Sequence, residues 1–129
     1  MNVTEFLKKD KFAALLGIEL LEATNGSAKT RLIIEDKHLN AMDIVHGGTI
    51  FSLADLTLAA AANSYGTVAV AINGNISFLK AATKDTLYAQ AIEVSRNSKI
   101  GTYSIHVTNS LGELISSFQG MVYFKKETF

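Results

Sequence analysis

The chain has 129 residues, 48% of them hydrophobic and 19% charged, so we expect one folded globular domain over residues 1–129. Lys and Arg together number twelve, as do Asp and Glu, and no basic stripe is interleaved with aromatic residues, so we expect no nucleic-acid partner. The absence of cysteine excludes disulfides, a cysteine nucleophile and thiolate metal ligands.

The front of the chain predicts one short helix and two strands. Asp10 can cap a helix over residues 10–16, and Gly17 can end it. The residues before it lack the charged-then-apolar pattern of a signal peptide, so we expect a cytoplasmic protein. A short apolar stretch over residues 18–21 precedes a turn at residues 25–26, and the alternation over residues 28–35 predicts a half-buried strand.

A long helix is predicted in the middle of the chain. Residues 38–45 show no period and indicate a loop, after which Gly47 and Gly48 open a run of helix formers that ends near Gly66. The run is apolar nearly all round, which indicates burial on most sides. Polar residues such as Ser52 interrupt it, so we expect no membrane span.

Asp55 is the only carboxylate, lysine or arginine between Ile44 and Leu79. A lone carboxylate in an apolar helix is costly unless another group pairs with it or the protein uses it. Asp55 is therefore the first candidate for a functional residue. The alternative is a buried Asp bonded to the backbone or to a hydroxyl such as that of Ser52.

Four more strands are expected after the helix, over residues 68–78, 86–96, 101–109 and 114–124, with a bulge near Ala91 and Ile92. Short connections favour antiparallel neighbours. The predicted fold is α+β, a curved antiparallel sheet wrapped around one buried helix. The outer sheet face carries small polar and apolar residues, which suggests that another copy of the chain covers part of it.

Three short motifs stand out together: His38-Leu39-Asn40, His46-Gly47-Gly48 and Leu53-Ala54-Asp55. With weaker matches over residues 15–124, they resemble the hotdog-fold acyl-CoA thioesterases of the phenylacetic-acid-degradation type. The resemblance implies a homo-oligomer, a dimer or a dimer of dimers, that hydrolyses an aromatic or medium-chain acyl-CoA. Coenzyme A is then part of the substrate, and no cofactor or metal is expected.

The resemblance assigns catalytic roles to Gly47, Asp55 and Asn40. The backbone N–H of Gly47, unpaired at a helix start, would receive the developing oxyanion. Asp55 would act as nucleophile or general base, and Asn40 would orient the acid or the water. Gly47 and Asp55 lie about 12 Å apart along one helix, so a site that uses both needs two chains with antiparallel helices.

The remaining predicted site residues are less specific. His46 is placed with the catalytic group, either as a base or, more in keeping with its position, as a helix cap. Arg96, Ser98 and Lys99 would hold phosphate or pantetheine, the alternative being an ordinary solvated hairpin. Gly48 and Asn63 complete the predicted substrate-binding set. His38 and His106 are expected to be surface or strand residues.

Two departures from the family pattern keep a second function open. Leu56 stands where the family often has Ser or Thr, so a hydroxyl beside the acid is missing, although Thr57 is close in sequence. Asp43 stands where the family commonly has Gly. The rival function is a non-enzymatic hotdog module that binds or senses an acyl-CoA or fatty-acyl ligand. A third function, a hotdog dehydratase or hydratase, would need a histidine and an acid on the helix, and residues 49–62 contain no histidine.

Overall fold

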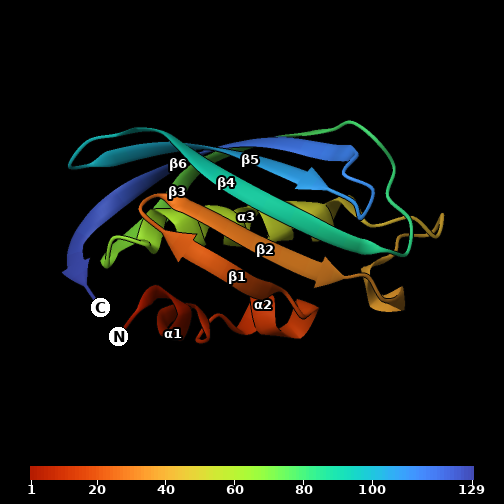
Figure 1. The fold of residues 1–129 in the computed structure, drawn as a ribbon, viewed down its shortest axis with the longest axis horizontal. Helices are drawn as coiled ribbons and strands as arrows, with labels where there is room; N and C mark the ends of the chain where they lie inside the picture. The colour runs from red at the N-terminus through yellow and green to blue at the C-terminus, as the bar shows by residue number, and fades with distance from the viewer.

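One antiparallel sheet wraps around one long helix in the computed structural model, which describes residues 1–129 (Figure 1). The central helix is α3, Gly47–Asn63, and the six strands follow the order β1-β2-β4-β5-β6-β3. The strands are β1 Glu19–Thr24, β2 Ser27–Ile33, β3 Thr67–Phe78, β4 Thr86–Arg96, β5 Ile100–Thr108 and β6 Leu114–Thr128. The predicted α+β hotdog architecture is confirmed. No helix combines the length and apolar character that a membrane crossing needs.

Small residues let α3 lie close against the concave face of the sheet. Ala60, Ala61 and Ala62 are fully buried on it, and Leu58 fills the space over Gly120, where an added Cβ would lie 2.6 Å from the Leu58 side chain. A buried hydrogen bond of 2.7 Å joins the hydroxyls of Thr30 on β2 and Thr57 on α3. These contacts set the position of the helix relative to the sheet.

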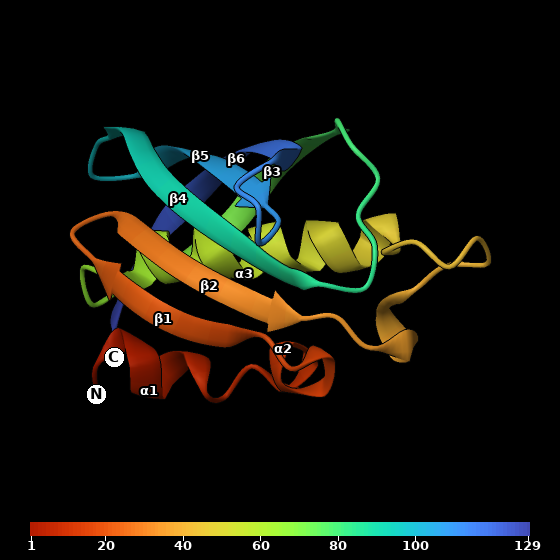
Figure 2. The same ribbon diagram turned by 45° about the vertical axis from the view of Figure 1, so that its right-hand side comes forward.

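Two short helices cover the side of α3 that the sheet leaves open (Figure 2). Helix α2, Lys11–Leu16, is capped by Asp10, whose side chain accepts the Ala13 N–H at 2.9 Å, and it ends at Gly17 with φ 86°, as predicted. Helix α1, Val3–Leu7, was not predicted, because its five residues bury none of their side chains and leave no periodic pattern. Phe6 stacks on Phe129 at 4.2 Å, which joins the two ends of the chain.

Strands β2, β4 and β5 bury alternate residues as predicted, whereas β3, with exposed Val70, Ile72 and Phe78, does not. Tyr103, Ile105 and Val107 of β5 are fully buried, and the turn before β2 uses positive φ at both Asn25 and Gly26. The bulge expected near Ala91 and Ile92 lies instead between Glu93 and Ser95, where β4 leaves register with β5. Strand β3 pairs only with β6, so its other edge has no neighbour within the chain.

Candidate active site at the start of the central helix

The loop that leads into α3 is anchored by a buried histidine. His38 is fully buried, its Nδ1 accepts the Glu35 N–H at 2.8 Å, and its Nε2 donates to the Leu16 carbonyl at 2.7 Å. The expectation that His38 is a surface or strand residue was therefore wrong, whereas His106 is exposed on β5 as predicted. His38 attaches the loop to the end of α2.

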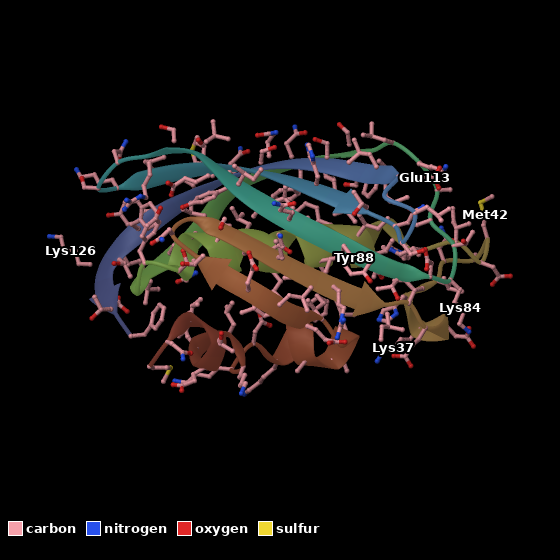
Figure 3. The ribbon with its side chains drawn as sticks, viewed as in Figure 1. Lys37, Met42, Lys84, Tyr88, Glu113 and Lys126 are labelled. Carbon is pink, nitrogen blue, oxygen red and sulfur yellow. The ribbon has the colours of Figure 1, made fainter.

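Asn40 closes the loop with one side of its amide and keeps the other side free. Its Oδ1 accepts the Met42 N–H at 2.9 Å and the Ile44 N–H at 3.4 Å, while its Nδ2 has no partner within the chain. Asp43 takes φ 57°, a left-handed conformation that explains why glycine suits this position. Met42 projects from the tip of the loop (Figure 3). The loop thus presents a free Nδ2 donor beside the start of α3.

His46 caps α3, which confirms the capping alternative. Its Nδ1 accepts the Gly48 N–H at 2.8 Å, and its carbonyl accepts the Thr49 N–H at 2.9 Å. The N–H of Gly47, between them, has no hydrogen-bond partner within the chain. A helix start carries partial positive charge, so this unpaired donor favours a negatively charged oxygen.

A pocket of about 330 Å³ lies against Gly47. Asn40 lines it together with Gly47, and apolar side chains of α3 and of the end of β3, Ile50 and Phe78 among them, form much of its wall. The Phe78 ring packs on the Gly47 Cα, so that a Cβ added to Gly47 would lie 3.2 Å from Cζ. The structure therefore brings two of the predicted catalytic residues, Asn40 and Gly47, to one pocket.

Asp55 lies two turns further along α3, outside that pocket. Its side chain is exposed in the single chain and makes no hydrogen bond, so the alternative of a buried Asp bonded to Ser52 was wrong. The Ser52 hydroxyl donates instead to the Gly48 carbonyl at 2.7 Å. Desolvation by the surrounding protein, and then the charge of Asp10, raise the pKa of Asp55. The carboxylate is thus unpaired and less acidic than usual.

No free hydroxyl stands beside Asp55. Leu56 turns away from it, under the N-terminal helices, and lines a separate cavity there. Thr57 is fully buried, and its Oγ1 bonds the Leu53 carbonyl at 2.7 Å as well as Thr30. Thr57 therefore cannot supply the hydroxyl that Leu56 lacks.

The basic corner predicted from the sequence lies at the other end of α3. Arg96 and Ser98 line a pocket of about 230 Å³ with Tyr65, and Lys99 is exposed on the same turn. Arg96 stacks over the Tyr65 ring at 3.8 Å and approaches Glu93 at 3.4 Å. Two contacts thus hold the Arg96 guanidinium, while Lys99 makes no ion pair. Within one chain this corner is remote from Gly47.

Asn63 and Gly48 have their polar groups engaged inside the chain. The Asn63 amide, 2% exposed, donates to the Ala59 carbonyl at 2.8 Å and accepts the Ala69 N–H at 2.9 Å, which links α3 to β3. The Gly48 N–H is bonded by His46. Their substrate-binding roles stay predictions.

Sequence reasoning missed Phe78 and Asp10 as neighbours of the site. Phe78 lies against Gly47, and Asp10 acts on Asp55 through its charge. Each is more than thirty residues from its partner in sequence, so no local pattern indicates the contact. The only sequence signal for Phe78 was the weak match of residues 76–80 to the hotdog thioesterase family.

Comparisons with known proteins identify the family and the fold. Residues 42–116 match the family model of the thioesterase superfamily. A protein of Archaeoglobus fulgidus named "Putative esterase" is 44% identical over 123 residues, 95% of this chain and 80% of its own. Acyl-coenzyme A thioesterase PaaI of Escherichia coli is 33% identical over 120 residues, 92% of this chain and 86% of its own. The solved structure of E. coli PaaI matches with a TM-score of 0.94 at 32% identity, covering 98% of this chain and 93% of that chain.

Proposed function

This chain belongs to the thioesterase superfamily, in its PaaI-like group, and from that premise we propose that it hydrolyses the thioester of an aromatic or medium-chain acyl-CoA. The observation that carries the proposal is the unpaired N–H of Gly47 at the wall of a pocket. A donor that is held in place before the reaction stabilises the oxyanion of a tetrahedral intermediate without having to reorganise.

Gly47 polarises the thioester carbonyl in this mechanism. The carbonyl oxygen accepts the Gly47 N–H, and the α3 dipole adds to the attraction as negative charge develops. The Nδ2 of Asn40, free on the same pocket, donates to the attacking water or to the carboxylate. The Phe78 ring excludes water from one side of Gly47.

Asp55 delivers the oxygen nucleophile. As a general base it takes a proton from water, which attacks the carbonyl carbon; as a nucleophile its carboxylate attacks directly and forms an anhydride that water then hydrolyses. In both cases the thiolate of coenzyme A leaves and takes up a proton. The raised pKa of Asp55 makes the carboxylate a stronger base than an ordinary Asp.

The site needs two copies of the chain. Gly47 and Asp55 are eight residues apart on a continuous helix, about 12 Å along its axis. Phe51, the midpoint, is half-exposed, so a two-fold axis beside it would set Gly47 of one copy opposite Asp55 of the other. The unpaired edge of β3 carries exposed Val70 and Ile72, which supports pairing through this edge.

The same arrangement gives the basic corner a use. In an antiparallel pair of α3 helices, the Arg96 end of one copy lies toward the Gly47 end of the other. Arg96, Ser98 and Lys99 would then receive the phosphates or pantetheine of an acyl-CoA whose carbonyl lies at the partner's helix start. The alternative is that Arg96 only braces Tyr65 and Glu93.

A non-enzymatic acyl-CoA or fatty-acyl binding module is the second candidate. The observation that favours it is the lack of a free hydroxyl beside Asp55, since Leu56 points away and Thr57 is bonded internally. A thiol-release assay on a panel of acyl-CoAs separates the two functions. We expect turnover by the wild type and none by folded Asp55→Ala. Tight binding without release from any acyl-CoA would instead support the binding module.

A further inference from the structure

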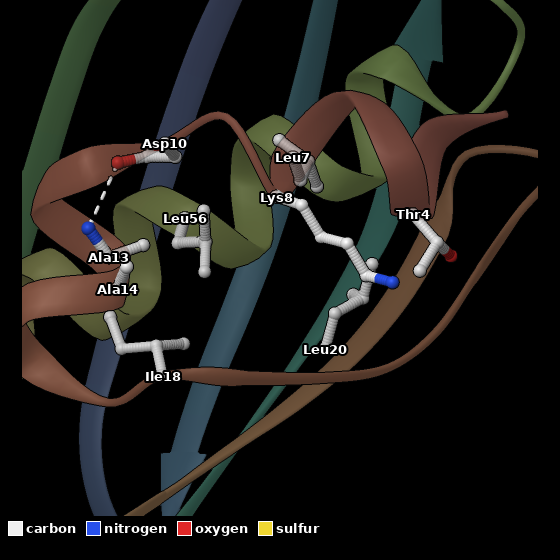
Figure 4. Close-up of a pocket in the computed structure, with 9 residues that line it drawn as sticks. All are labelled: Thr4, Leu7, Lys8, Asp10, Ala13, Ala14, Ile18, Leu20 and Leu56. Carbon is white, nitrogen blue, oxygen red and sulfur yellow. Dashed lines mark hydrogen bonds between the residues drawn. The ribbon is translucent and has the colours of Figure 1, made fainter. Parts of the chain in front are cut away.

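A cavity of about 290 Å³ lies between the N-terminal helices and α3 (Figure 4). Leu56 projects from α3 into its middle, with the residues of α2 on one side and those of α1 on the other. Ile18, just before β1, and Leu20 of β1 close it on a third side. Neither the oxyanion donor nor the basic corner takes part in this cavity.

The cavity is apolar inside and polar at its rim. Leu56 and Ala13 are buried and form the floor, whereas Thr4 and Lys8 are exposed at the edge. Asp10 also lines it, with one carboxylate oxygen bonded to the Ala13 N–H at 2.9 Å. Such a lining suits a hydrocarbon group that enters from a polar site.

The cavity is linked to the candidate acid through two of its lining residues. Leu56 directly follows Asp55 on α3, and, after desolvation, the charge of Asp10 contributes to the raised pKa of Asp55. Asp55 itself does not line the cavity and is exposed and unpaired one position before Leu56. An acyl group bound in the cavity would therefore reach Asp55 from within the chain that carries Asp55, not from the partner chain.

We propose that this cavity is the acyl subsite, and that it takes the apolar end of an acyl group of the size of an aromatic ring plus a short linker. The proposal rests on the proposed thioesterase function. A dry cavity of roughly 150 Å³ suffices to bind benzene. The present cavity, about 290 Å³, has room for such a ring and for the atoms that join it to the carbonyl.

The pocket at Gly47 suits the other arm of the thioester. It is more open than the cavity under the N-terminal helices, and Lys80 lines it. The pantetheine chain has to lead out to solvent, whereas the acyl group gains from enclosure. With the carbonyl between Asp55 and the partner's helix start, the two arms extend in different directions.

The cover of the cavity can open to admit the group. Helix α1 has no fully buried residue; Leu7 packs partly against the core, and Phe6 stacks on Phe129. Segments with few buried contacts open at a low free energy. Entry therefore does not require the sheet or α3 to move.

Filling the cavity from the cover tests the proposal. Ala14 is exposed on α2 but lines the cavity, so Ala14→Leu adds bulk there without disturbing the core. Lys11→Leu puts the same side chain on an exposed position of α2 outside the cavity and is the matched control. We expect Ala14→Leu to lower kcat/KM for arylacetyl- and octanoyl-CoA, relative to that for acetyl-CoA, on the order of tenfold, and Lys11→Leu to leave this ratio as in the wild type.

A second variant and a binding measurement keep the outcome decisive. Leu56→Ala, checked for folding by circular dichroism, should shift the preference toward larger acyl groups. The affinity of an octanoyl-CoA thioether, relative to that of coenzyme A alone, should fall in Ala14→Leu whether or not the wild type turns over. If Ala14→Leu loses the affinity gained from the octanoyl group but the wild type hydrolyses no acyl-CoA, the thioesterase function is wrong and the subsite is right. Two results would overturn the subsite. In the first, the affinity gained from the octanoyl group and the acyl preference are the same in wild type, Ala14→Leu and Lys11→Leu. In the second, only Phe78→Ala changes them.

Discussion

The Nδ1 of His46 accepts the backbone N–H of Gly48 at 2.8 Å, and this bond separates two tasks at the start of α3. One N–H is used to cap the helix, and the neighbouring N–H of Gly47 is left for a ligand. The histidine of the His46-Gly47-Gly48 motif thus has a structural use that does not require it to exchange protons with substrate.

Removing the cap should lower stability more than it lowers activity. We expect His46→Ala to reduce the free energy of unfolding by about 1 kcal/mol, the usual effect of losing a cap, and His46→Asn to restore most of it. Urea denaturation measures the first effect and kcat the second. A loss of kcat by a hundredfold or more in His46→Asn at full stability would show that the imidazole acts as a base.

Proline at Gly47 tests the oxyanion donor directly. Gly47 is the first residue of α3, a position that accepts proline, and His46 has ψ 136°, which suits the residue before a proline. Gly47→Pro replaces the N–H by a ring carbon and adds a Cβ against Phe78, while Gly47→Ala adds the same Cβ and keeps the N–H. We expect kcat to fall roughly a hundredfold to a thousandfold in Gly47→Pro relative to Gly47→Ala. Equal kcat in the two variants would exclude the Gly47 N–H.

Asn40 can be divided into its two functions by substitution. Asn40→Asp keeps an acceptor for the N–H groups of Met42 and Ile44 but loses the free Nδ2 donor. We expect Asn40→Asp to melt close to the wild type and to lose activity, and Asn40→Ala to lose both. Thermal melting and thiol release measure the two properties. Full activity in Asn40→Asp would limit Asn40 to holding the loop.

The charge of Asp10 should shift the pH dependence of activity. Desolvation and then Asp10 raise the pKa of Asp55, so Asp10→Asn, which still caps α2, should lower that pKa. Because the ionised carboxylate is the active form, activity rises with pH through the pKa of Asp55, and the variant's rise should occur at lower pH. An unchanged pH–rate profile would exclude Asp10 as an influence on the acid.

The same raised pKa has a consequence for stability. A carboxyl whose pKa is raised by folding binds its proton more tightly in the folded state, so its stabilising contribution is present below its ordinary pKa of 3.8 and is lost as the pH rises through the folded value. Asp55→Asn is neutral throughout and should therefore gain stability over the wild type as the pH rises through that window. A Tm difference that stays constant from acid to neutral pH would contradict this.

The fold was predictable where the pattern is local. Gly47 and Gly66 bracket an apolar run, and the alternation of Tyr103, Ile105 and Val107 gave β5 and its buried face. His38 was misjudged because its burial depends on the Leu16 carbonyl, which lies 22 residues away in sequence. The bulge at Glu93 was misplaced by the same lack of cross-strand information.

The site was predictable only as a set of residue types. The spacing of Gly47 and Asp55 on one helix indicated that two chains are needed, because a helix has a fixed rise per residue. The cover that α1 and α2 place over Leu56 could not be predicted from the sequence, since these helices lie about forty residues or more before Leu56 and reach it only through tertiary packing.

The central claim is that each site combines Asp55 of one copy with Gly47 of another. Mixing Asp55→Asn with Gly47→Pro after unfolding and refolding together tests it most directly by thiol release. In a mixed dimer one site carries both substitutions and the other carries neither, so random pairing should restore about a quarter of wild-type activity from two inactive variants. Activity no higher than the sum of the two separate variants, with mixed dimers demonstrated, would contradict the shared site.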